Sequence, residues 1–464
     1  MRAIGVDIGT TTISFVVLDT DSGDVLECVN TPNPAAYPGA HPFERVQDPE
    51  TIVSQVSAQL KLLKKRYAPI GVIGLDGQMH GMLYTDAQGR AVSPLYTWQD
   101  GHGELDAGGE TMAQALSRLT GYAMATGYGL TTHFALTRLG KVPAQAAKLC
   151  TIADYAAMRL TGRTRPLCHA SNAASMGLFH AARGEWDGAA VTRAGLAAEL
   201  LPDTTTSCTI LGEDADGTPV ACAIGDNQAS FIGAVSEPEH SVLVNVGTGA
   251  QISMAGRAQR PLALCEQRPL EGESMLLVGS SLCGGRAYAL LHRFFLDCAK
   301  LAGCDADSLY AQMNEAALRV SGEPSLRVNT RFCGSRSNPQ ERGCIGNIGE
   351  ENLDASQLTA GVLWGMADEL WSFYAEMTEA GAQPARIMIG SGNGVRRNPA
   401  LCRALRQRFG MEIRVPAHHE EAACGAALSA VGALCGEEAG ARARHLIRYL
   451  EETDCAGDMR ENRA

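Results

Sequence analysis

Asp7 is the first residue in the chain whose surroundings suit phosphate chemistry. It comes just before the turn Gly9-Thr10-Thr11-Thr12, where glycine lets a ligand approach the backbone and threonine hydroxyls lie beside exposed N–H groups. A carboxylate at that place can hold a metal ion next to bound phosphates. The alternative interpretation is an ordinary hairpin with a polar tip.

Two predicted β-strands flank this turn. Apolar residues alternate with small or polar ones over 3–8, and 13–18 is β-branched and apolar. The stretch 244–253 repeats the plan with one residue inserted: apolar, Asp or Asn, apolar, Gly-Thr, and a second strand that begins Ile-Ser. A duplicated architecture with a nucleotide between its halves is therefore predicted. The residues of the second turn are Gly247, Thr248 and Gly249.

This layout resembles the superfamily of sugar kinases, chaperone ATPases and actin. The resemblance implies an α/β fold of two ribonuclease H-like domains with a nucleotide cleft between them. A boundary is expected at 237–241, which contains a proline and mixed charges, so the domains would be 1–236 and 237–464. A chaperone ATPase would need a large peptide-binding domain after the nucleotide domain, and we expect the chain to be too short for one.

A second group of candidate residues follows a predicted buried strand, 71–76, in the loop Gly77-Gln78-Met79-His80-Gly81. Ligands of open α/β sheets bind beyond the carboxyl ends of strands. A lone histidine is more often a structural hydrogen-bonding residue. The loop is, however, similar to the sugar-binding loop of the FGGY carbohydrate kinases, especially xylulokinases and sedoheptulokinases. The resemblance implies that Gln78, Met79 and His80 bind sugar.

Trp98 and Asp100 come shortly afterwards. A tryptophan face packs against the C–H surface of a sugar, and a carboxylate accepts hydrogen bonds from two sugar hydroxyls. A core tryptophan followed by a turn aspartate is the alternative. Many FGGY kinases have an arginine two residues after the aspartate matched by Asp100, and this chain has His102 there. That departure leaves the identity of the sugar open.

Asp226 follows another predicted strand and stands where the FGGY pattern Gly-Asp-x-Gln-Ala carries the catalytic aspartate. Aspartate is also favoured at a helix N-cap, and both roles can hold at once. The resemblance further implies substrate contacts from Asn172 and Asn227. Together with 97–101, the blocks 125–131, 151–155 and 170–177 look most like those of sedoheptulokinases.

In the second half, a Gly-rich loop follows the predicted strand 385–389. It is not a dinucleotide fingerprint, because Val395 replaces the third glycine, and the chain has no Walker lysine motif. The loop is similar to the adenosine loop of the FGGY kinases, with a Gly-rich strand–helix turn as the alternative. The implied nucleotide-binding residues are Gly390, Gly392, Asn393 and Asn398.

Composition excludes several classes of function. A chain of 464 residues is too long for one core and suits two domains. Its 39 Lys and Arg against 51 Asp and Glu give a net charge of −12, which argues against nucleic acid as a partner. There is no apolar run of 18 residues, so no membrane association is expected.

The 15 cysteines are scattered, odd in number and without a Cys-x-x-Cys spacing. This usage indicates reduced thiols and a cytoplasmic protein. Some iron–sulfur dehydratase activators share the opening hairpin, but no set of cysteines here suits a cluster shared across a dimer. The oligomeric state stays open, with a homodimer as one alternative.

Together these assignments predict an ATP-dependent sugar kinase. The two turns would hold the phosphates of ATP, Asp7 would orient Mg²⁺ through water, and Asp226 would accept the proton of a primary hydroxyl. We expect the substrate to be sedoheptulose, converted to sedoheptulose 7-phosphate. Xylulose or another ketose or polyol is the alternative, and a non-catalytic sugar sensor is the alternative of a different class.

Overall fold

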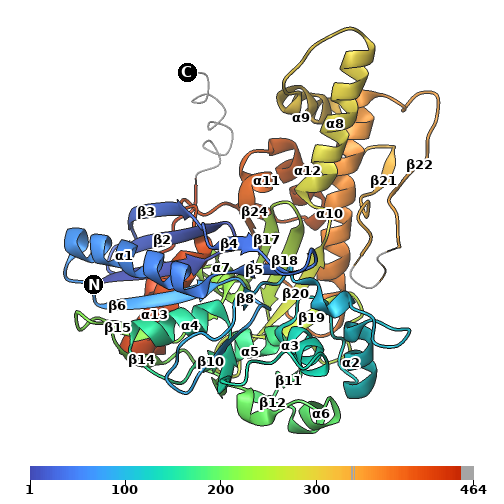
Figure 1. Cartoon of the computed structure of the whole chain (residues 1–464). Coiled ribbons are helices and arrows are strands. Elements are labelled where there is room, and N and C mark those ends of the chain that lie inside the picture. The colour runs from blue at the N-terminus through green and yellow to red at the C-terminus, as the bar shows by residue number, and fades with distance from the viewer. Residues whose placement is uncertain (336–337, 339, 451–464) are drawn as a thin grey trace. The chain divides into compact units, whose positions relative to one another are not determined.

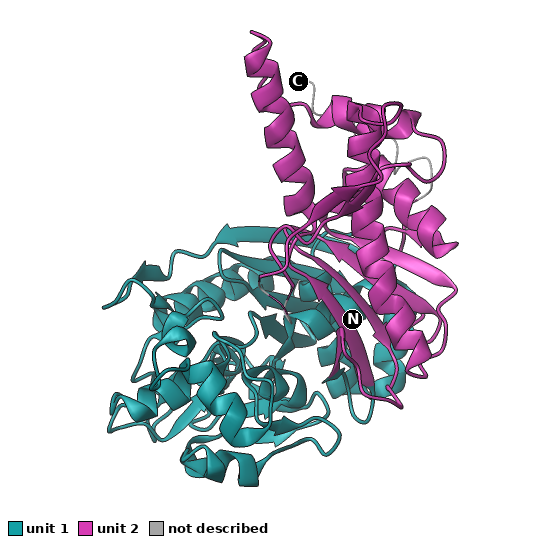
Figure 2. Cartoon of the chain, turned by 90° about the vertical axis from the view of Figure 1, so that its right-hand side faces the viewer, with its two compact units in different colours: residues 1–236, 268–274, 418–447 teal, residues 237–267, 275–417, 448–464 magenta. Residues whose placement is uncertain are grey.

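The computed structural model describes residues 1–335, 338 and 340–450. The chain forms two compact units, which Figure 2 shows in different colours. Unit 1 comprises residues 1–236, 268–274 and 418–447, and unit 2 comprises residues 237–267, 275–417 and, among those described, 448–450. The functional division into 1–236 and 237–464 stays a prediction.

Unit 1 is built on a seven-stranded sheet in the order β14-β15-β6-β1-β2-β3, with β16 paired to β6 (Figure 1). The hairpin predicted from the sequence is confirmed, because β1 and β2 are antiparallel neighbours; β1 also runs parallel to β6. The strands of this sheet are β1 (Arg2–Ile8), β2 (Thr12–Asp19), β3 (Val25–Pro32), β6 (Val72–Gly77), β14 (Ile210–Glu213), β15 (Pro219–Ala221) and β16 (Ile224–Gly225).

Helices and short strands complete unit 1. Their sequences carry start signals: α1 has Asp48 as N-cap and proline in its first turn, and α4 has a capping box between Thr151 and Asp154. The helices are α1 (Pro49–Tyr67), η1 (Gly101–Glu104), α2 (Met112–Thr120), α3 (Gly129–Arg138), α4 (Ile152–Leu160), α5 (Ala170–Met176), α6 (Gly188–Arg193), η2 (Ala198–Leu200), α7 (Asp226–Ala234), α13 (Glu421–Cys435) and α14 (Glu437–His445). The short strands are β4 (Ala36–Pro38), β5 (Arg45–Gln47), β7 (Leu83–Thr85), β8 (Leu95–Tyr96), β9 (Lys148–Cys150), β10 (Leu167–His169), β11 (Phe179–His180), β12 (Glu185–Trp186) and β13 (Asp203–Thr205).

The helices α7 and α13 pack against each other with glycine on both sides. A Cβ added to Gly425 would lie 1.8 Å from the backbone oxygen of Ala229, and one added to Gly233 would lie 1.9 Å from that of Glu421. Backbone therefore touches backbone, which only glycine allows. Because α7 begins at Asp226, this packing also fixes the position of that carboxylate.

Gly425→Ala is expected to destabilise the protein by about 1–3 kcal/mol, because the new methyl group forces α7 and α13 apart. The midpoint of thermal unfolding measures the effect. Gly432→Ala on the same helix is the matched control, since its added Cβ would meet nothing closer than 3.9 Å. There alanine should be neutral or stabilising, by up to about 1 kcal/mol. Equal unfolding midpoints for the two variants would contradict the packing argument.

Unit 2 repeats the plan with a six-stranded sheet in the order β19-β20-β18-β17-β23-β24. The second predicted hairpin is confirmed as β17 antiparallel to β18, and β17 is parallel to β23. The strands are β17 (Ser241–Val246), β18 (Ala250–Ala255), β19 (Cys265–Pro269), β20 (Met275–Ser281), β21 (Arg327–Asn329), β22 (Cys344–Gly346), β23 (Ile387–Ser391) and β24 (Glu412–Arg414). The helices are α8 (Gly285–Leu301), α9 (Tyr310–Arg319), α10 (Ala355–Glu379), α11 (Gly392–Arg396) and α12 (Pro399–Phe409).

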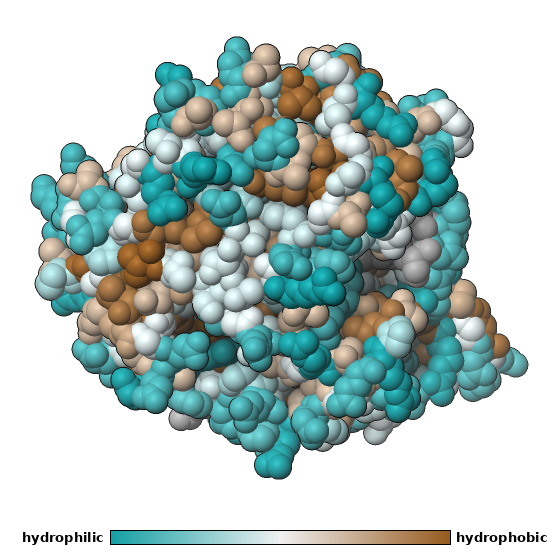
Figure 3. Space-filling view, turned by 90° about the horizontal axis from the view of Figure 1, so that it is seen from below, coloured by the Kyte–Doolittle hydropathy of each residue, from teal (hydrophilic) through white to brown (hydrophobic). Residues whose placement is uncertain are grey.

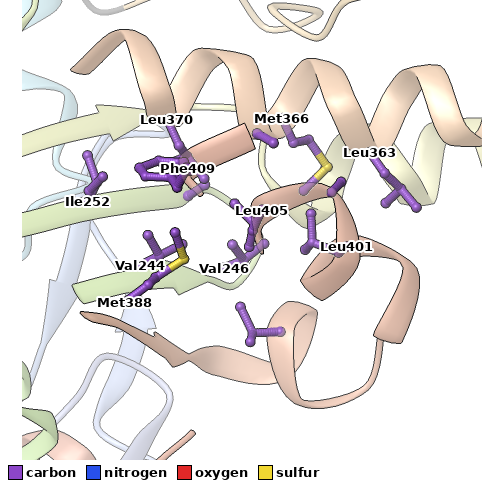
Figure 4. Close-up of a cluster of buried hydrophobic side chains, with 14 of the residues drawn as sticks. Val244, Val246, Ile252, Leu363, Met366, Leu370, Met388, Leu401, Leu405 and Phe409 are labelled. Atoms are coloured by element: carbon purple, nitrogen blue, oxygen red, sulfur yellow. The ribbon is translucent and has the colours of Figure 1, made fainter. Parts of the chain in front are cut away.

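The core of unit 2 lies between this sheet and helices α10 and α12 (Figure 4). Val244 and Met388 come from the strands, and Leu370 and Phe409 face them from the helices. Burying such side chains stabilises the folded state by roughly 25 cal/mol for each Å² of apolar surface removed from water. The core thereby anchors the ends of β17 and β23, where candidate functional residues begin.

The surface carries mixed side chains. On the face shown in Figure 3, hydrophilic residues are interspersed with hydrophobic ones. Among the described residues, none of the helices combines the length and apolar character needed to cross a membrane. The charged stretch beyond Gly436 forms α14 as far as His445, and residues 451–464 lie outside the described part of the chain.

Candidate active site

Three carboxyl groups gather at the carboxyl ends of neighbouring parallel strands in unit 1. Asp7, near the end of β1, is directly paired with Asp76 of β6. Gly225 of β16 pairs with Gly77, so Asp226 follows one residue beyond. The sequence predicted a role for Asp7 and Asp226, whereas Asp76 was assigned only to the end of a strand. The pairing of β1 with β6, which the sequence does not reveal, brings Asp76 to Asp7.

Burial and mutual repulsion govern the ionisation of this cluster. Burial, aided by the charge of Asp226, raises the pKa of Asp7 to about 7. Burial also raises the pKa of Asp226 to about 6, while the backbone N–H of Asn227 and the Arg268 guanidinium act in the opposite direction. Buried beside Asp7 and Asp226, Asp76 has a pKa well above its usual range. A cation would relieve this repulsion.

Asp76 is the most deeply buried of the three. Its side chain is 0% exposed, and neither carboxyl oxygen accepts a hydrogen bond from a donor in the described structure. Asn227, one residue beyond Asp226, accepts a hydrogen bond of 3.3 Å from Arg268 Nη1 through its side-chain oxygen. The cluster thus combines acidic groups with one nearby arginine.

The carboxylate cluster has the donor chemistry of a magnesium site. Mg²⁺ is bound by one or two carboxylates, completed by water and substrate phosphates. Among the described residues no group of three or more His, Cys, Asp or Glu side chains could enclose a metal ion by itself. An open site of that kind, centred on Asp7, fits Mg²⁺ carried in with a phosphate ligand.

His80 is held in a strained conformation at the edge of the predicted sugar loop. Its φ is +74°, in the left-handed region that a non-glycine residue adopts at a cost of roughly 1–2 kcal/mol. Ser175 fixes it from two sides: the Ser175 hydroxyl accepts the His80 N–H at 3.1 Å, and the Ser175 carbonyl lies 2.7 Å from Nδ1. The ring stacks on Tyr128 at 4.7 Å between centroids. Backbone strain held by such contacts is typical of binding sites.

A hydrogen-bond network joins the first turn to the sugar loop. Thr10 Oγ1 accepts a hydrogen bond from Trp98 Nε1 at 3.0 Å and donates one to Gln78 Oε1 at 3.2 Å. Gln47 closes the ring, accepting from Gln78 Nε2 at 2.8 Å and donating to the Thr10 carbonyl at 2.7 Å. The structure thus brings together Thr10, Gln78 and Trp98, and Trp98 stays 48% exposed and accessible to a ligand.

The remaining residues of the first turn are Gly9, Thr11 and Thr12. Thr11 and Thr12 are exposed. The carbonyl of Gly9 accepts a hydrogen bond from Asn33 Nδ2 at 2.9 Å. Thr10, Thr11 and Asn33 are among the residues around a hollow of about 730 Å³ in unit 1. A ligand of sugar size fits a space of that volume.

Asp100 and Asn172 are buried, unlike Trp98, Thr11 and Thr12. Asp100 is 0% exposed, accepts the backbone N–H groups of His102 and Arg45, and its Oδ1 lies 2.7 Å from His102 Nδ1. Asn172 is 1% exposed and donates to Asp154 Oδ1 and to the carbonyl of Ala223. Met79 is buried as well, within van der Waals reach of Gly225. These contacts suit residues that support the site, and direct sugar binding by them stays a prediction.

Unit 2 contains a pocket of about 880 Å³ beside its own Gly-Thr turn. Gly247 and Thr248 line it from the β17–β18 turn, and the start of α11, which packs against β17, lines it as well. Further predicted residues on the lining are Gly392, Asn393 and Asn398. Its volume lies within the usual range for small-molecule sites.

At its glycine positions, the pocket of unit 2 is lined by backbone atoms, because glycine has no side chain. Gly392 has a φ of +79°, and a Cβ there would lie 2.6 Å from Asn245 Oδ1. Above Gly247, by contrast, a Cβ would meet nothing within 4 Å, so that glycine faces open space. Gly249 and Gly390 do not line the pocket: Gly249 packs on Gly284, and a Cβ on Gly390 would strike Val395.

The sequence did not predict another part of the lining, formed by residues of α8 and α9. Tyr288 donates a hydrogen bond of 2.6 Å to Asn314 Oδ1, and Tyr310 stacks on His292 with 3.9 Å between ring centroids. Arg286 completes this part of the lining. Aromatic rings and an amide suit a flat heterocycle such as a base. No sequence signal points to these residues, because their meeting depends on the tertiary packing of α8 and α9.

Comparison with known proteins gives the following. Residues 2–233 match the model for the FGGY family of carbohydrate kinases, N-terminal domain, and residues 242–434 match that for the C-terminal domain. The chain is 27% identical to a mouse (Mus musculus) sedoheptulokinase, over 92% of this chain and 96% of the relative. It is 23% identical to a xylulose kinase of Streptomyces coelicolor, over 95% of this chain and 90% of the relative.

A solved structure supports the fold. The crystal structure of xylulose kinase from Rhodospirillum rubrum superimposes with a TM-score of 0.82. It covers 97% of this chain and 93% of its own, at 21% sequence identity. The two-domain α/β architecture predicted from the sequence is therefore confirmed.

Proposed function

The chain belongs to the FGGY family of carbohydrate kinases, and on that premise we propose that its acceptor is a ketose, sedoheptulose first, phosphorylated on its terminal primary hydroxyl. The family makes it an ATP-dependent phosphotransferase. Similarity to sedoheptulokinase along nearly the full length of both chains supports the seven-carbon acceptor. Xylulose is the second candidate, favoured by a similar coverage at somewhat lower identity.

The catalytic part of the proposal rests on one observation. Asp226 begins α7 directly beyond the parallel pair β6–β16, and burial raises its pKa to about 6. An aspartate with a pKa near the working pH is a good general base. We therefore propose that Asp226 accepts the proton of the attacking hydroxyl.

The other proposed site residues bind and orient ATP, Mg²⁺ and the sugar. The pocket of unit 2 takes the adenosine, with Gly247 and Thr248 against phosphate. For the Gly9–Thr12 turn of unit 1, contact with phosphate stays a prediction. Asp7 would hold Mg²⁺, whose chemistry is to neutralise charge that develops on the phosphates. Trp98 and His80 face the sugar; Gln78 holds Trp98 in place through Thr10, and Ser175 holds His80.

A panel of ketoses and polyols, assayed by coupled ADP release, tests the substrate. We expect the highest kcat/KM for sedoheptulose, and phosphorus NMR of the product should show a single phosphate on C7. A higher kcat/KM for xylulose would move the assignment to the second candidate. ADP release that is independent of any added sugar would overturn the acceptor class.

The activity should begin to fall at about pH 6, well above the pH at which an ordinary aspartate is protonated. Because burial raises the pKa of Asp226 from 3.8 to about 6, its base form is lost as the pH falls through 6. The kcat/KM for sugar should fall roughly tenfold per pH unit below that value. Steady-state kinetics between pH 4.5 and 8 measure this. A profile that stays flat to pH 5 would contradict the role of Asp226.

Trp98→Ala should raise the KM for sugar roughly tenfold, because the lost ring face is worth about 1 kcal/mol or somewhat more. The KM for ATP should rise much less, because Trp98 reaches the proposed phosphate turn only through its hydrogen bond to Thr10. Trp98→Phe keeps a ring in place and serves as the matched variant, with a smaller effect. Parallel increases in both KM values would argue against a sugar-facing tryptophan.

A further inference from the structure

Two cysteine thiols meet beside the pocket of unit 2. Cys283 lies in the turn between β20 and α8, and Cys333 lies in the segment after β21. Their sulfur atoms are 3.7 Å apart, and the described cysteines are all free. Cys283 is 1% exposed, whereas Cys333 is half-buried and therefore within reach of a small reagent.

Other contacts hold the two segments together independently of the thiols. Glu369 of α10 accepts a hydrogen bond from Ser281 Oγ at 2.7 Å and one from Arg331 Nε at 3.2 Å. Ser281 precedes Cys283 by two residues, and Arg331 precedes Cys333 by two. The close approach of the sulfurs is thus part of the folded arrangement.

The turn that carries Cys283 also supports the Gly-Thr turn of the pocket. Gly285 and Arg286 donate backbone N–H groups to the carbonyls of Gly247 at 2.8 Å and Thr248 at 3.0 Å. A Cβ on Gly284 would lie 2.2 Å from the Gly249 carbonyl oxygen, so there is no slack between the two turns. Any shift of Cys283 is therefore transmitted to 247–249.

We propose that Cys283 and Cys333 form a reversible disulfide that weakens nucleotide binding at the adjacent pocket. To bond, the sulfurs must come about 1.7 Å closer than their present separation. This displaces the turn that supports Gly247 and Thr248. It also removes the thiol of Cys333, the acceptor of a 3.6 Å hydrogen bond from Arg286 Nη1, and Arg286 lines the pocket.

The oxidant is a small-molecule disulfide, for which glutathione disulfide serves as probe. The accessible Cys333, as thiolate, attacks one sulfur of the probe, forming a mixed disulfide and expelling one glutathione thiolate. Cys283 then loses its proton and attacks the Cys333 sulfur, expelling the second. One disulfide forms in the protein, and one disulfide is reduced to two thiols. Burial and the contact with Cys333 raise the pKa of Cys283 to about 12, so Cys283 has little thiolate at neutral pH and its attack is the slower of the two steps.

The pairing itself is tested on the full chain by incubation with glutathione disulfide, alkylation of the remaining thiols and mass-spectrometric peptide mapping without reduction. We expect a peptide linked through Cys283 and Cys333, and its loss after dithiothreitol. A mixed disulfide that never closes, or a different cysteine pair, would overturn the inference.

The effect on binding rests on the proposed nucleotide site, so reduced protein is first titrated with a fluorescent ATP analogue. Absence of binding there would refute the proposed site and not the thiol pair. With binding established, oxidation should raise the KM for ATP about fivefold or more, a typical coupling between sites. Cys333→Ser should abolish that change, and Cys304→Ser, at an exposed cysteine, should leave it intact. A mapped disulfide with an unchanged KM would overturn the inference.

Discussion

Asp226→Asn is expected to lower kcat by about 10² to 10⁴, the usual contribution of a general base. Asparagine keeps the size of the side chain and its place at the start of α7, but it cannot take up a proton at working pH. The packing of α7 on α13 does not involve the carboxylate, so the fold should survive. Steady-state kinetics with saturating sugar and ATP measure the loss.

The control for this variant is Asp203→Asn, which changes an exposed aspartate in β13 in the same unit. It should leave kcat within the error of the wild type. Thermal unfolding of both variants separates a catalytic loss from a folding defect. If the Asp226 variant kept most of its kcat, the residue would have to be removed from the catalytic role.

The duplicated hairpins explain why so much of the fold could be predicted. Their strands carry local signals, with β-branched residues on either side of a Gly-Thr turn, and the structure contains both hairpins. Asp7 pairs with Asp76 in unit 1, and at the corresponding place in unit 2 Asn245 pairs with Ser391. One unit thus carries two acids where the other carries two neutral groups. Neutral groups and glycine backbone suit an anionic nucleotide, while acids suit a cation or a proton.

The burial of single side chains could not be predicted in the same way. Trp98 and Asp100 are two residues apart, yet one is half exposed and the other is enclosed by His102 and the backbone of Arg45. Spacing along the chain does not reveal which side chain faces the ligand, because a turn closed by the Asp100 N–H and the Thr97 carbonyl, 3.0 Å apart, redirects the backbone between them. The Arg that many FGGY kinases have at position 102 is replaced here by a buried histidine paired to Asp100.

Long-range packing limited the prediction elsewhere. Helix α13 comes from the C-terminal half of the sequence but belongs to unit 1, where the carbonyl of its Ala423 lies where a Cβ of Gly5 would be. Its small residues permit close packing, but their spacing does not identify α7 and β1 as the elements that they contact. Likewise, Tyr310 and Asn314 lie on a helix whose spacing says nothing about the pocket they line.

Asp7→Asn is expected to raise the Mg²⁺ concentration for half-maximal activity roughly 10- to 100-fold, the usual loss of metal affinity when a supporting group is removed. Asp7 is the half-buried carboxylate directly before the Gly9–Thr12 turn, and burial beside Asp226 raises its pKa to about 7. Such a group gains most from a neighbouring cation, because the cation offsets the repulsion. Excess Mg²⁺ should therefore recover part of the activity. Asp19→Asn, at the opposite end of the same hairpin, is the matched control and should need no additional Mg²⁺. If both variants showed the Mg²⁺ dependence of the wild type, Asp7 would not hold the metal, and the acidic cluster would need another cation.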